Sequence, residues 1–558
     1  MTDRIIVLKF GSSVLGNRTD LLNAVHEIYR WYRDGWRVVA IVSAIGKTTE
    51  ALLAEARELA VRSQPDATAE LLATGERHCA ALLGIALDRA GVKSSVVDPR
   101  EIGMTVAGSA LDSELVAVDR GRIAALLDES AVLVIPGFFA YNTEGKLHLL
   151  GRGGSDLSAV YLAQALNARC RLIKDVDGVY ESDPAQAAGS LRRFVSLGYA
   201  DALLRARQLI QPKAVHFIEQ HAASVEVASM ASGYESVVGR HESNLVDAAI
   251  KPPSSVLILG LGTVGRGVYQ RIAAIPGRFR VIGALVRDRA KHSADGVPAE
   301  LLHESIDDLA KLSPDIVIDA LPGLQPSQSL VRYYLAHGVA VVTANKALVA
   351  AAGLDLREIA AKARTDILAS AAVGGSAPMI EALRQEKRRG SIQSIAGVLN
   401  GTCNYVLDRC MDGLDFSAAV SAAQASGFAE ADPSEDLSSR DAARKLRILA
   451  RLAFDKEMDS LEIEALDAAA VSGARQSLRD GESLRMIGRA RQHDGIVTGE
   501  IRLEPVAAGD GFAAITEEWN RLAIKRTTGE EIAVTGRGAG RWPTTEAMMA
   551  DLFELSRR

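Results

Sequence analysis

The chain has 558 residues, of which 48% are apolar and 24% charged, and its formal net charge is −6 at pH 7. This composition is typical of globular proteins and excludes a largely disordered chain, and the mild acidity argues against a primary nucleic-acid binder. The length predicts roughly three to five folding units, and no apolar run approaches the roughly 18 residues of a membrane-spanning helix.

The four cysteines, Cys79, Cys170, Cys403 and Cys410, form no C-x-x-C pair, so we expect reduced, structural thiols and no zinc site. The apolar run at residues 5–8 is too short for a secretory signal and indicates a buried first strand instead. We therefore expect a cytoplasmic protein that has no membrane partner.

Short apolar runs alternate with longer amphipathic segments along the whole chain. The runs at residues 5–8, 38–42 and 256–259 are typical of strands buried on both faces. Helical patterns lie between such runs, for example at residues 21–33 and 266–274. This alternation predicts an α/β fold with a mainly parallel sheet. Two such series meet at a Pro-Pro linker, which places the main domain boundary near residue 252.

Three turns rich in small residues follow predicted strands in the first series, at residues 9–13, 42–49 and 150–156. Turns without bulky side chains let backbone N–H groups approach an anion, and a helix that begins after the turn adds its dipole. A single such turn is more often a plain tight turn. Three together, with Lys9 and Arg152 in them, favour a phosphate site, and it is not a Walker P-loop because that motif is absent.

The most specific segments of this half are L-G-R-G-G-S-D at residues 150–156 and K-D-V-D-G-V-Y-E-S-D-P at residues 174–184. T-G-E at residues 74–76 and Q-P-K-A-V-H at residues 211–216 accompany them. With the first turn, these segments resemble the amino-acid kinase superfamily, and specifically aspartate kinase, over about residues 4–245. The resemblance implies an αβα kinase domain that phosphorylates L-aspartate with ATP and Mg²⁺.

The resemblance also implies site residues. Lys9, Lys213 and Gly11 would face the ATP phosphates, Asp156 would lie near the phosphates and Mg²⁺, Asp175 and Tyr180 would line the nucleotide pocket, and Thr48, Glu76, Arg152 and Ser155 would hold aspartate. A guanidinium fork suits a carboxylate and Glu76 suits an ammonium. The attacking carboxylate is ionised at neutral pH, so such a site aligns it and neutralises charge without a general base.

Three positions depart from the kinase pattern. Ser12, or a one-residue deletion, stands where the family has a second glycine, Lys174 replaces a threonine, and Ala185 replaces an arginine that often follows D-P. A side chain at the Ser12 position could crowd a phosphate. The alternative is therefore an active second half joined to a degenerate kinase half that serves for binding or dimerisation.

The second series opens with a strand and the turn Gly260-Leu261-Gly262-Thr263-Val264-Gly265, which a helical pattern follows. In this context G-x-G-x-x-G is a dinucleotide fingerprint of a Rossmann domain. The second strand ends at Arg287 rather than at an acid. An arginine there accommodates the 2′-phosphate of NADP, so NADP(H) is preferred and NAD stays possible.

The acids Glu430, Asp432, Asp436 and Asp441 lie within sixteen residues of Lys445, and Asp441 and Lys445 share a helix face. A surface ion pair is the simpler interpretation, but four acids near one lysine suit a polar amino-acid substrate.

Further segments support a resemblance that covers about residues 254–558: V-T-A-N-K-A-L at 342–348, A-V-G-G-S-A-P at 372–378, G-V-L-N-G-T-C-N-Y at 397–405, R-D-A-A-R-K-L at 440–446 and G-R-G-A-G at 536–540. The family they resemble is homoserine dehydrogenase.

By that resemblance Lys445 donates a proton to the aldehyde as hydride arrives, and Lys346 assists at the nicotinamide. Glu430, Asp441, Gly427 and Asp436 would bind substrate, and Gly538 would contact the cofactor. Carbonyls of Val373, Gly375 and Ala377 would hold Na⁺ or K⁺, although Ser370 stands where relatives carry an acid.

Together the halves resemble a bifunctional aspartate kinase–homoserine dehydrogenase that acts in threonine, methionine and lysine biosynthesis. We expect a kinase domain at residues 1–250, a Rossmann domain at 251–385 with an inserted α+β catalytic and dimerisation domain at 386–535, and a returning segment at 536–558. The resemblance implies at least a homodimer. The length leaves no room for paired regulatory modules, so no threonine or lysine feedback through them is expected.

Overall fold

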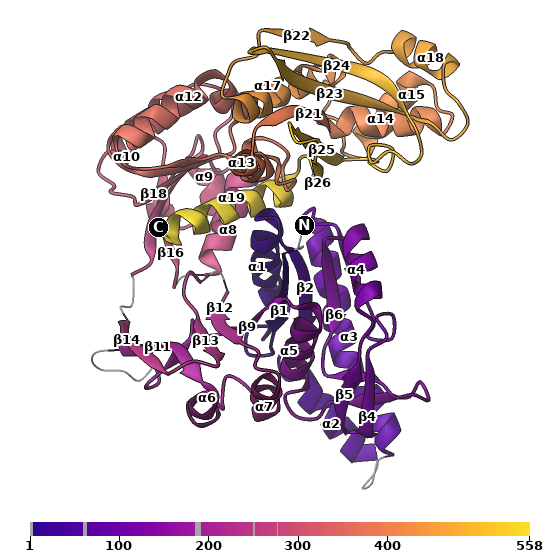
Figure 1. The fold of residues 1–558 in the computed structure, drawn as a ribbon. Coiled ribbons are helices and arrows are strands. Elements are labelled where there is room, and N and C mark those ends of the chain that lie inside the picture. Colours follow the sequence, from indigo (N-terminus) through magenta and orange to yellow (C-terminus); the bar gives the residue numbers. More distant parts are fainter. Residues whose placement is uncertain are drawn as a thin grey trace. The chain divides into compact units, whose positions relative to one another are not determined.

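The computed structural model describes residues 4–59, 64–184, 191–230, 232–248, 252–275 and 277–557. The chain divides into two compact units that meet between Lys251 and Pro252 (Figure 1). The last strand of the first unit ends at Ala248 and the first strand of the second begins at Ser254. Ala185, one of the departures from the kinase pattern, lies outside the described residues, as do the linker residues 249–251.

The first unit is built on a ten-stranded sheet whose centre is parallel. Its strands, in spatial order, are β10 (Val179–Tyr180), β11 (Leu191–Gly198), β13 (Ser236–Gly239), β12 (Val225–Ser229), β9 (Arg169–Lys174), β1 (Ile5–Phe10), β2 (Arg37–Val42), β6 (Val132–Pro136) and β3 (Ser94–Val96), with β14 (Asn244–Ala248) paired to β11. A small sheet beside it has the order β5 (Asp112–Ala117), β4 (Thr105–Ser109), β7 (Phe139–Tyr141) and β8 (Leu147–Leu149).

Helices cover this sheet: α1 (Leu21–Arg33), α2 (Thr48–Leu59), α3 (Pro65–Arg89), α4 (Arg120–Glu129), α5 (Gly154–Leu166), α6 (Tyr199–Arg205) and α7 (Pro212–Gln220). The central strands are buried almost throughout, and their Val, Leu and Ile side chains form one core with α5 and α7. Left-handed residues bound α5, because Gly153 has φ +82° and Asn167 has φ +50°.

The second unit begins with a six-stranded parallel sheet in the order β17 (Leu302–His303), β16 (Phe279–Leu285), β15 (Ser254–Leu259), β18 (Ile316–Asp319), β19 (Ala340–Thr343) and β20 (Ile367–Leu368). In chain order these strands run 3-2-1-4-5-6, which is the order of a Rossmann sheet. Its helices are α8 (Thr263–Ala273), α9 (Arg289–Ala294), α10 (Ile306–Leu309), α11 (Ser327–Ala336) and α12 (Lys346–Lys362).

A second six-stranded sheet follows in the order β22 (Ser460–Ile463), β24 (Ile496–Val506), β23 (Ser483–His493), β21 (Ile392–Val398), β25 (Trp519–Arg526) and β26 (Glu531–Arg537). Its helices are α13 (Met379–Arg389), α14 (Gly401–Met411), α15 (Phe416–Ala425), α16 (Ser434–Leu437), α17 (Arg440–Phe454) and α18 (Ala468–Gln476). Side chains of β21, β23, α14 and α17 share one apolar core.

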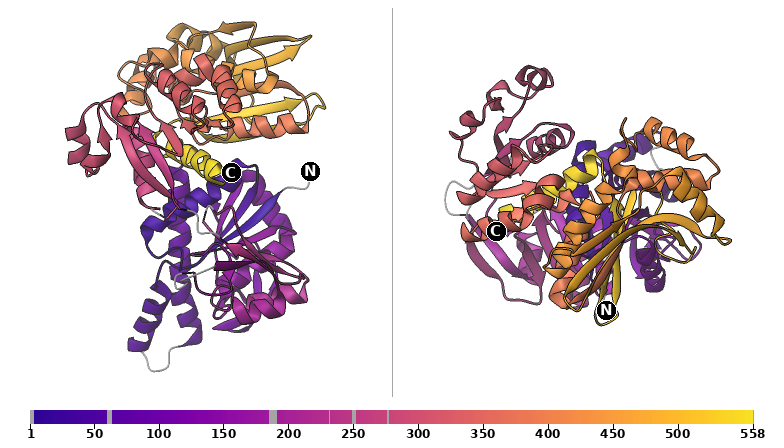
Figure 2. Two further views of the ribbon diagram at one scale, coloured as in Figure 1. Left: turned by 90° about the vertical axis from the view of Figure 1, so that its left-hand side faces the viewer. Right: turned by 90° about the horizontal axis from the view of Figure 1, so that it is seen from above.

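The last helix, α19 (Arg541–Arg557), returns to the parallel sheet. All three views show it beside that sheet (Figures 1 and 2), and the ring of Phe553 lies 5.0 Å from the ring of Phe279. Asp551 accepts a hydrogen bond from the backbone N–H of Ser370 at 2.9 Å. In the part of the chain that the structure describes, no helix is both long and apolar enough to cross a membrane.

Helix starts differ most from the sequence expectations. The helix expected at residues 266–274 begins at Thr263, and α5 begins at Gly154, inside the glycine-rich turn at residues 150–156. The first turn of α8, Thr263-Val264-Gly265, has one apolar side chain, so it adds little to the apolar periodicity from which the helix was predicted. The structure thus places both glycine-rich turns directly at helix N-termini.

Candidate active sites

The first candidate site surrounds the carboxylate of Asp156, in the first turn of α5. Lys9, near the end of β1, places its Nζ 2.7 Å from Asp156 Oδ1. Lys174 ends the neighbouring strand β9, and its Nζ lies 3.5 Å from both Asp156 oxygens. The backbone N–H of Gln211 donates to Asp156 Oδ2 at 3.4 Å. All three charged side chains are buried, so one carboxylate here faces two ammonium groups.

These charges shift one another's pKa. Burial alone raises the pKa of Asp156, but the ammonium groups of Lys9 and Lys174 outweigh it and hold that pKa below its usual range. Burial, with the repulsion of Lys9, lowers the pKa of Lys174 to about 8. The cluster is therefore one positive charge in excess when both lysines are protonated, which suits an anionic ligand.

Glu76, on α3, is another buried carboxylate of this unit, at 3% exposure. Its Oε1 accepts a hydrogen bond from the backbone N–H of Ala44 at 3.2 Å, whereas its Oε2 has no hydrogen-bond partner among the described residues. Burial raises the pKa of Glu76 to about 7. A buried carboxylate oxygen without a partner fits a ligand ammonium.

Some of the other predicted kinase residues are tightly packed or hydrogen-bonded, and others are exposed. Gly11 and Ser155 lie in tight surroundings, because a Cβ on Gly11 would lie 2.8 Å from Lys9 Nζ and Ser155 packs against Gly137. Thr48 donates to the carbonyl of Ile45 at 2.7 Å. Arg152 and Asp175 are exposed, Ser12 is exposed in the first turn, and the Tyr180 hydroxyl donates to Asp177.

Lys213, at the start of α7, is held by the small sheet beside the site. Its Nζ lies 2.6 Å from Asp112 Oδ1 and donates to the carbonyls of Ser113 at 3.1 Å and Leu150 at 3.0 Å. An ammonium has three protons, so these contacts use all of them. In this structure Lys213 is therefore engaged with protein oxygens, whereas Lys174 stands beside Lys9.

The second candidate site begins at the turn between β15 and α8. Gly260 has φ +93°, a conformation that favours glycine. A Cβ on Gly265 would lie only 1.9 Å from the carbonyl oxygen of Gly260, whereas a Cβ on Gly262 would meet no atom within 4 Å. The turn is thus closed on its inner side and open at Gly262, as pyrophosphate binding requires.

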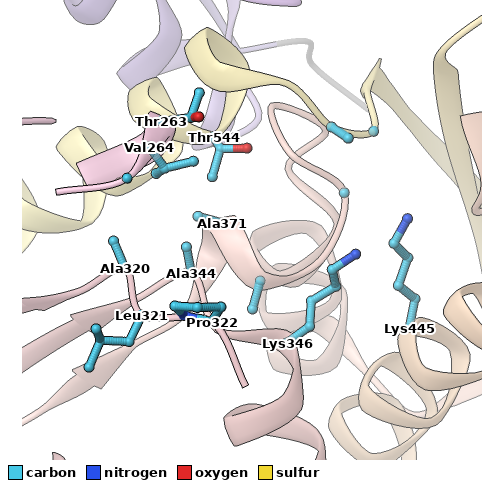
Figure 3. Close-up of a pocket in the computed structure, with 15 residues that line it drawn as sticks. Thr263, Val264, Ala320, Leu321, Pro322, Ala344, Lys346, Ala371, Lys445 and Thr544 are labelled. Carbon is cyan, nitrogen blue, oxygen red and sulfur yellow. The ribbon is translucent and has the colours of Figure 1, made fainter. Parts of the chain in front are cut away.

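A cavity of about 390 Å³ opens at this turn (Figure 3). Gly262, Thr263 and Val264 line it with Gly538 and Thr544, Ala320, Leu321 and Pro322 line it from the end of β18, and Lys346 and Lys445 close the other side. Figure 3 shows both lysine side chains extending to the same end of the pocket. Four of the predicted cofactor residues therefore share one cavity with the two lysines: Gly262, Thr263, Val264 and Gly538.

Asp441 joins these two lysines. Its Oδ1 lies 2.6 Å from Lys346 Nζ and its Oδ2 lies 2.8 Å from Lys445 Nζ. Lys445 also donates to the carbonyl of Leu399 at 2.6 Å. Asp441 and Lys445 are buried one turn apart on α17, so the pair expected from their i,i+4 spacing is an interior one.

Charge and burial tune this second cluster. Burial opposes ionisation of Asp441, but Lys445 and Lys346 outweigh it and hold the pKa of Asp441 well below its usual range. Burial lowers the pKa of Lys445, with Lys346 adding to the effect and Asp441 opposing it. A lysine with a lowered pKa releases its proton more readily, which suits a proton donor.

Asn400 connects the acids of the cluster, and sequence reasoning missed it. Its side-chain amide donates to Asp436 Oδ1 at 2.7 Å and to Asp441 Oδ2 at 3.1 Å. Asn400 belongs to the G-V-L-N-G-T segment, and that motif is the one feature of the sequence that could have pointed to it. Glu430 and Gly427, by contrast, are exposed on the loop before α16. Asp432 Oδ1 accepts a hydrogen bond from the backbone N–H of Ser434. The structure thus brings Asp436 and Asp441 together, and leaves Glu430 at the surface.

Lys346 is positioned by a chain of hydrogen bonds that starts at the buried Asp319. Asp319 Oδ2 accepts from Thr343 at 2.8 Å, and Thr343 Oγ1 accepts from the N–H of Asn345 at 3.0 Å. Asn345 in turn caps α12 through Leu348 N at 3.1 Å. Because Lys346 is the first residue of α12, its backbone is fixed by this chain of contacts.

The structure also places Arg287 and the predicted monovalent-cation site. Arg287 lies exposed just past the end of β16. The segment that holds Val373, Gly375 and Ala377 is a tight turn in which Gly374 has φ +88° and Gly375 has φ +57°. The carbonyl of Ala377 accepts the N–H of Met379 at 2.7 Å. Within the described residues, no group of His, Cys, Asp and Glu side chains forms a metal cluster.

Family models match three segments of the chain. Residues 4–229 match the amino acid kinase family, residues 260–370 match the homoserine dehydrogenase NAD binding domain, and residues 378–553 match homoserine dehydrogenase. The first match contains the Asp156 cluster, and the other two contain the cofactor turn and Lys445.

Individual relatives align with the second unit. A homoserine dehydrogenase of Synechocystis sp. is 33% identical over 313 residues, which are 53% of this chain and 72% of the relative. That of Corynebacterium glutamicum is 32% identical over 54% of this chain and 72% of the relative. The crystal structure of a homoserine dehydrogenase from Thiobacillus denitrificans, 33% identical, superposes with a TM-score of 0.50 over 55% of this chain and 73% of that one.

The cofactor turn makes a testable distinction between two glycines. In Gly265→Ala the new methyl would collide with the carbonyl of Gly260, so the turn must shift; we expect NADPH binding to be lost and the second unit to be destabilised by about 1–3 kcal/mol. Gly262→Ala is the matched control, because it should keep the stability and weaken only NADPH binding. Urea denaturation and NADPH fluorescence titration measure both, and wild-type affinity in Gly265→Ala would contradict the assignment.

Glu76 makes the stability of the first unit depend on pH. Its folded pKa of about 7 lies above the ordinary value of 4.5, so its contribution is complete below pH 4.5 and is lost as the pH rises through 7. Between pH 5 and 8 the unfolding free energy of the wild type should fall by about 2–3 kcal/mol relative to Glu76→Gln. Urea denaturation at both pH values tests this, with the exposed Glu58→Gln as control. A constant difference would show that Glu76 titrates normally.

Proposed function

The chain belongs to the homoserine dehydrogenase family and carries an amino acid kinase domain before it, and we propose that it catalyses two steps of one biosynthetic route. The first unit would phosphorylate L-aspartate with ATP to 4-phospho-L-aspartate, and the second would reduce L-aspartate 4-semialdehyde to L-homoserine. The observation that carries the second activity is Lys445, which is buried against Asp441 at the end of the cofactor cavity.

In the dehydrogenase site the cavity fits a nicotinamide cofactor, which supplies the hydride when bound. The open side of Gly262 and the N-terminus of α8 suit its pyrophosphate, and the apolar floor at Ala320 and Leu321 suits a ring. Lys445 would hold the aldehyde oxygen and give it a proton as negative charge develops there. Lys346 and Asp441 would orient the ammonium group of Lys445. Asp436 would face the ammonium group of the substrate.

In the kinase site the aspartate side-chain carboxylate attacks phosphorus directly, so alignment and charge are what the protein must supply. The free oxygen of Glu76 suits the substrate ammonium. Arg152, exposed beside the glycine-rich turn, has the fork that a carboxylate requires. Lys9 would contact the transferring phosphoryl group, and Asp156 would hold Lys9 and help to bind Mg²⁺, whose donors are oxygens.

Three finer assignments follow the same proposal. Arg287 supports NADP(H) over NAD, because an exposed guanidinium after the second strand can reach a 2′-phosphate. The turn at Val373, Gly375 and Ala377 offers backbone carbonyls of the kind that bind Na⁺ or K⁺. We also propose a cytoplasmic homo-oligomer, on the family resemblance alone.

A second candidate function for the first unit is a binding or dimerisation module without catalysis. It is favoured by Lys213, whose ammonium is tied to Asp112 and two carbonyls, and by Ser12 in the first turn. The buried cluster of Lys9, Asp156 and Lys174 favours the active kinase, because a protein that binds no phosphate has no use for a buried excess of positive charge.

Lys445→Ala tests the dehydrogenase site. Removing the proton donor should lower the rate of NADPH oxidation with aspartate semialdehyde by about 10²–10⁴-fold and leave NADPH affinity and kinase turnover intact. The exposed Lys311→Ala in the same unit is the matched control. Full activity in Lys445→Ala would show that the proton comes from another group.

Lys9→Ala tests the kinase site. With Mg-ATP and aspartate in excess, the wild type should form an acyl phosphate that hydroxylamine traps as aspartate hydroxamate. The variant should lose about 10²–10³-fold of that rate, because one charge at the transferring phosphoryl group is gone. NADPH oxidation should stay unchanged. If the wild type forms no hydroxamate, the non-catalytic module is the correct alternative.

A further inference from the structure

Lys174 is the least expected member of the Asp156 cluster. It stands where the resembled kinase family has a threonine, yet its ammonium is buried at 8% exposure. Strands β1 and β9 are parallel neighbours, with Lys9 opposite Leu172, so the two lysines leave the sheet at the same edge. That edge is the one at which Asp156 begins α5.

The contacts of Lys174 leave it incompletely neutralised. Its Nζ lies 3.5 Å from each Asp156 oxygen, which is long, because Lys9 already holds that carboxylate at 2.7 Å. In the described part of the chain Asp156 is its one hydrogen-bond partner, and the other acid whose charge acts on it is the exposed Asp175. These two long contacts leave at least one of its three protons without an acceptor.

A buried ammonium without sufficient counter-charge is unfavourable unless an anion completes it. Lys213, the other lysine expected at the phosphates, already spends its protons on Asp112, Ser113 and Leu150. The second site repeats the arrangement, since Asp441 lies between Lys346 and Lys445 and both of these line a ligand cavity.

We propose that Lys174 is a phosphate-binding cation of the first site, which shares Asp156 with Lys9 and contacts the phosphate chain of the nucleotide, an inference that rests on the proposed kinase function. Lys174 thus supplies the positive charge at the phosphates that Lys213 does not supply in this structure.

The experiment is calorimetric titration of the full chain with the non-hydrolysable analogue AMP-PNP and Mg²⁺, compared with adenosine, which has no phosphates. Lys174→Met should weaken AMP-PNP at least tenfold and leave adenosine and NADPH affinity unchanged, and Lys174→Arg should retain part of the affinity. Lys93→Met is the matched control, because Lys93 is exposed just before β3, at the opposite end of the parallel strands.

The outcomes separate the two proposals. Equal AMP-PNP affinity in Lys174→Met and the wild type would overturn the role of Lys174 and leave the kinase proposal standing. A gain of affinity in Lys174→Thr would overturn it too, because the ammonium would then block the site. If the wild type binds no AMP-PNP, the kinase proposal itself fails. Should Lys174→Met not fold, as judged by its melting curve, Lys174→Thr carries the same test, with weaker AMP-PNP binding as the supporting result.

Discussion

Each half of the chain holds a buried carboxylate between two lysine ammonium groups, and both proposed active sites depend on this arrangement. Burying one charge alone is costly, so a lysine can enter the interior only with a partner. Asp156 and Asp441 supply that partner and fix the ammonium groups in place. Because Asp156 alone cannot neutralise two lysines, the first cluster keeps a positive charge for a phosphate. The second cluster also holds Asp436 beside Asp441, and there Lys445 is the group that faces the oxygen that becomes negative in the reaction.

The fold explains how residues distant in sequence reach one cluster. Parallel strands end at the same edge of a sheet, and ligands of such folds bind there. Lys9 and Lys174 come from neighbouring strands, and Asp156 from the helix between them in the chain. In the second unit, the hydrogen-bond chain from Asp319 fixes the start of α12, and α17 brings Asp441 and Lys445 to meet it. The chemistry of both units thus follows from strand order and helix starts.

Much of this could be predicted from the sequence. The alternation of apolar runs gave the α/β class, and the glycine-rich turns located the cofactor cavity, because both are local patterns. Lys174, Asn400 and the ties of Lys213 could not be predicted, because they depend on side chains that meet only after folding. Lys174 was visible as a departure from a motif, but its meaning required the position of Asp156. Glu430 is the opposite case. It lies close in sequence to the acids of the cluster, but its side chain is exposed.

The central claim is that one chain carries two independent catalytic centres, and the direct measurement is both reactions on one purified preparation. Aspartate hydroxamate formation with Mg-ATP and NADPH oxidation with aspartate semialdehyde should co-purify at a constant ratio, and each should proceed unchanged when the substrates of the other are withheld. NADPH oxidation without any hydroxamate in excess Mg-ATP would contradict the claim and leave the first unit without a catalytic role.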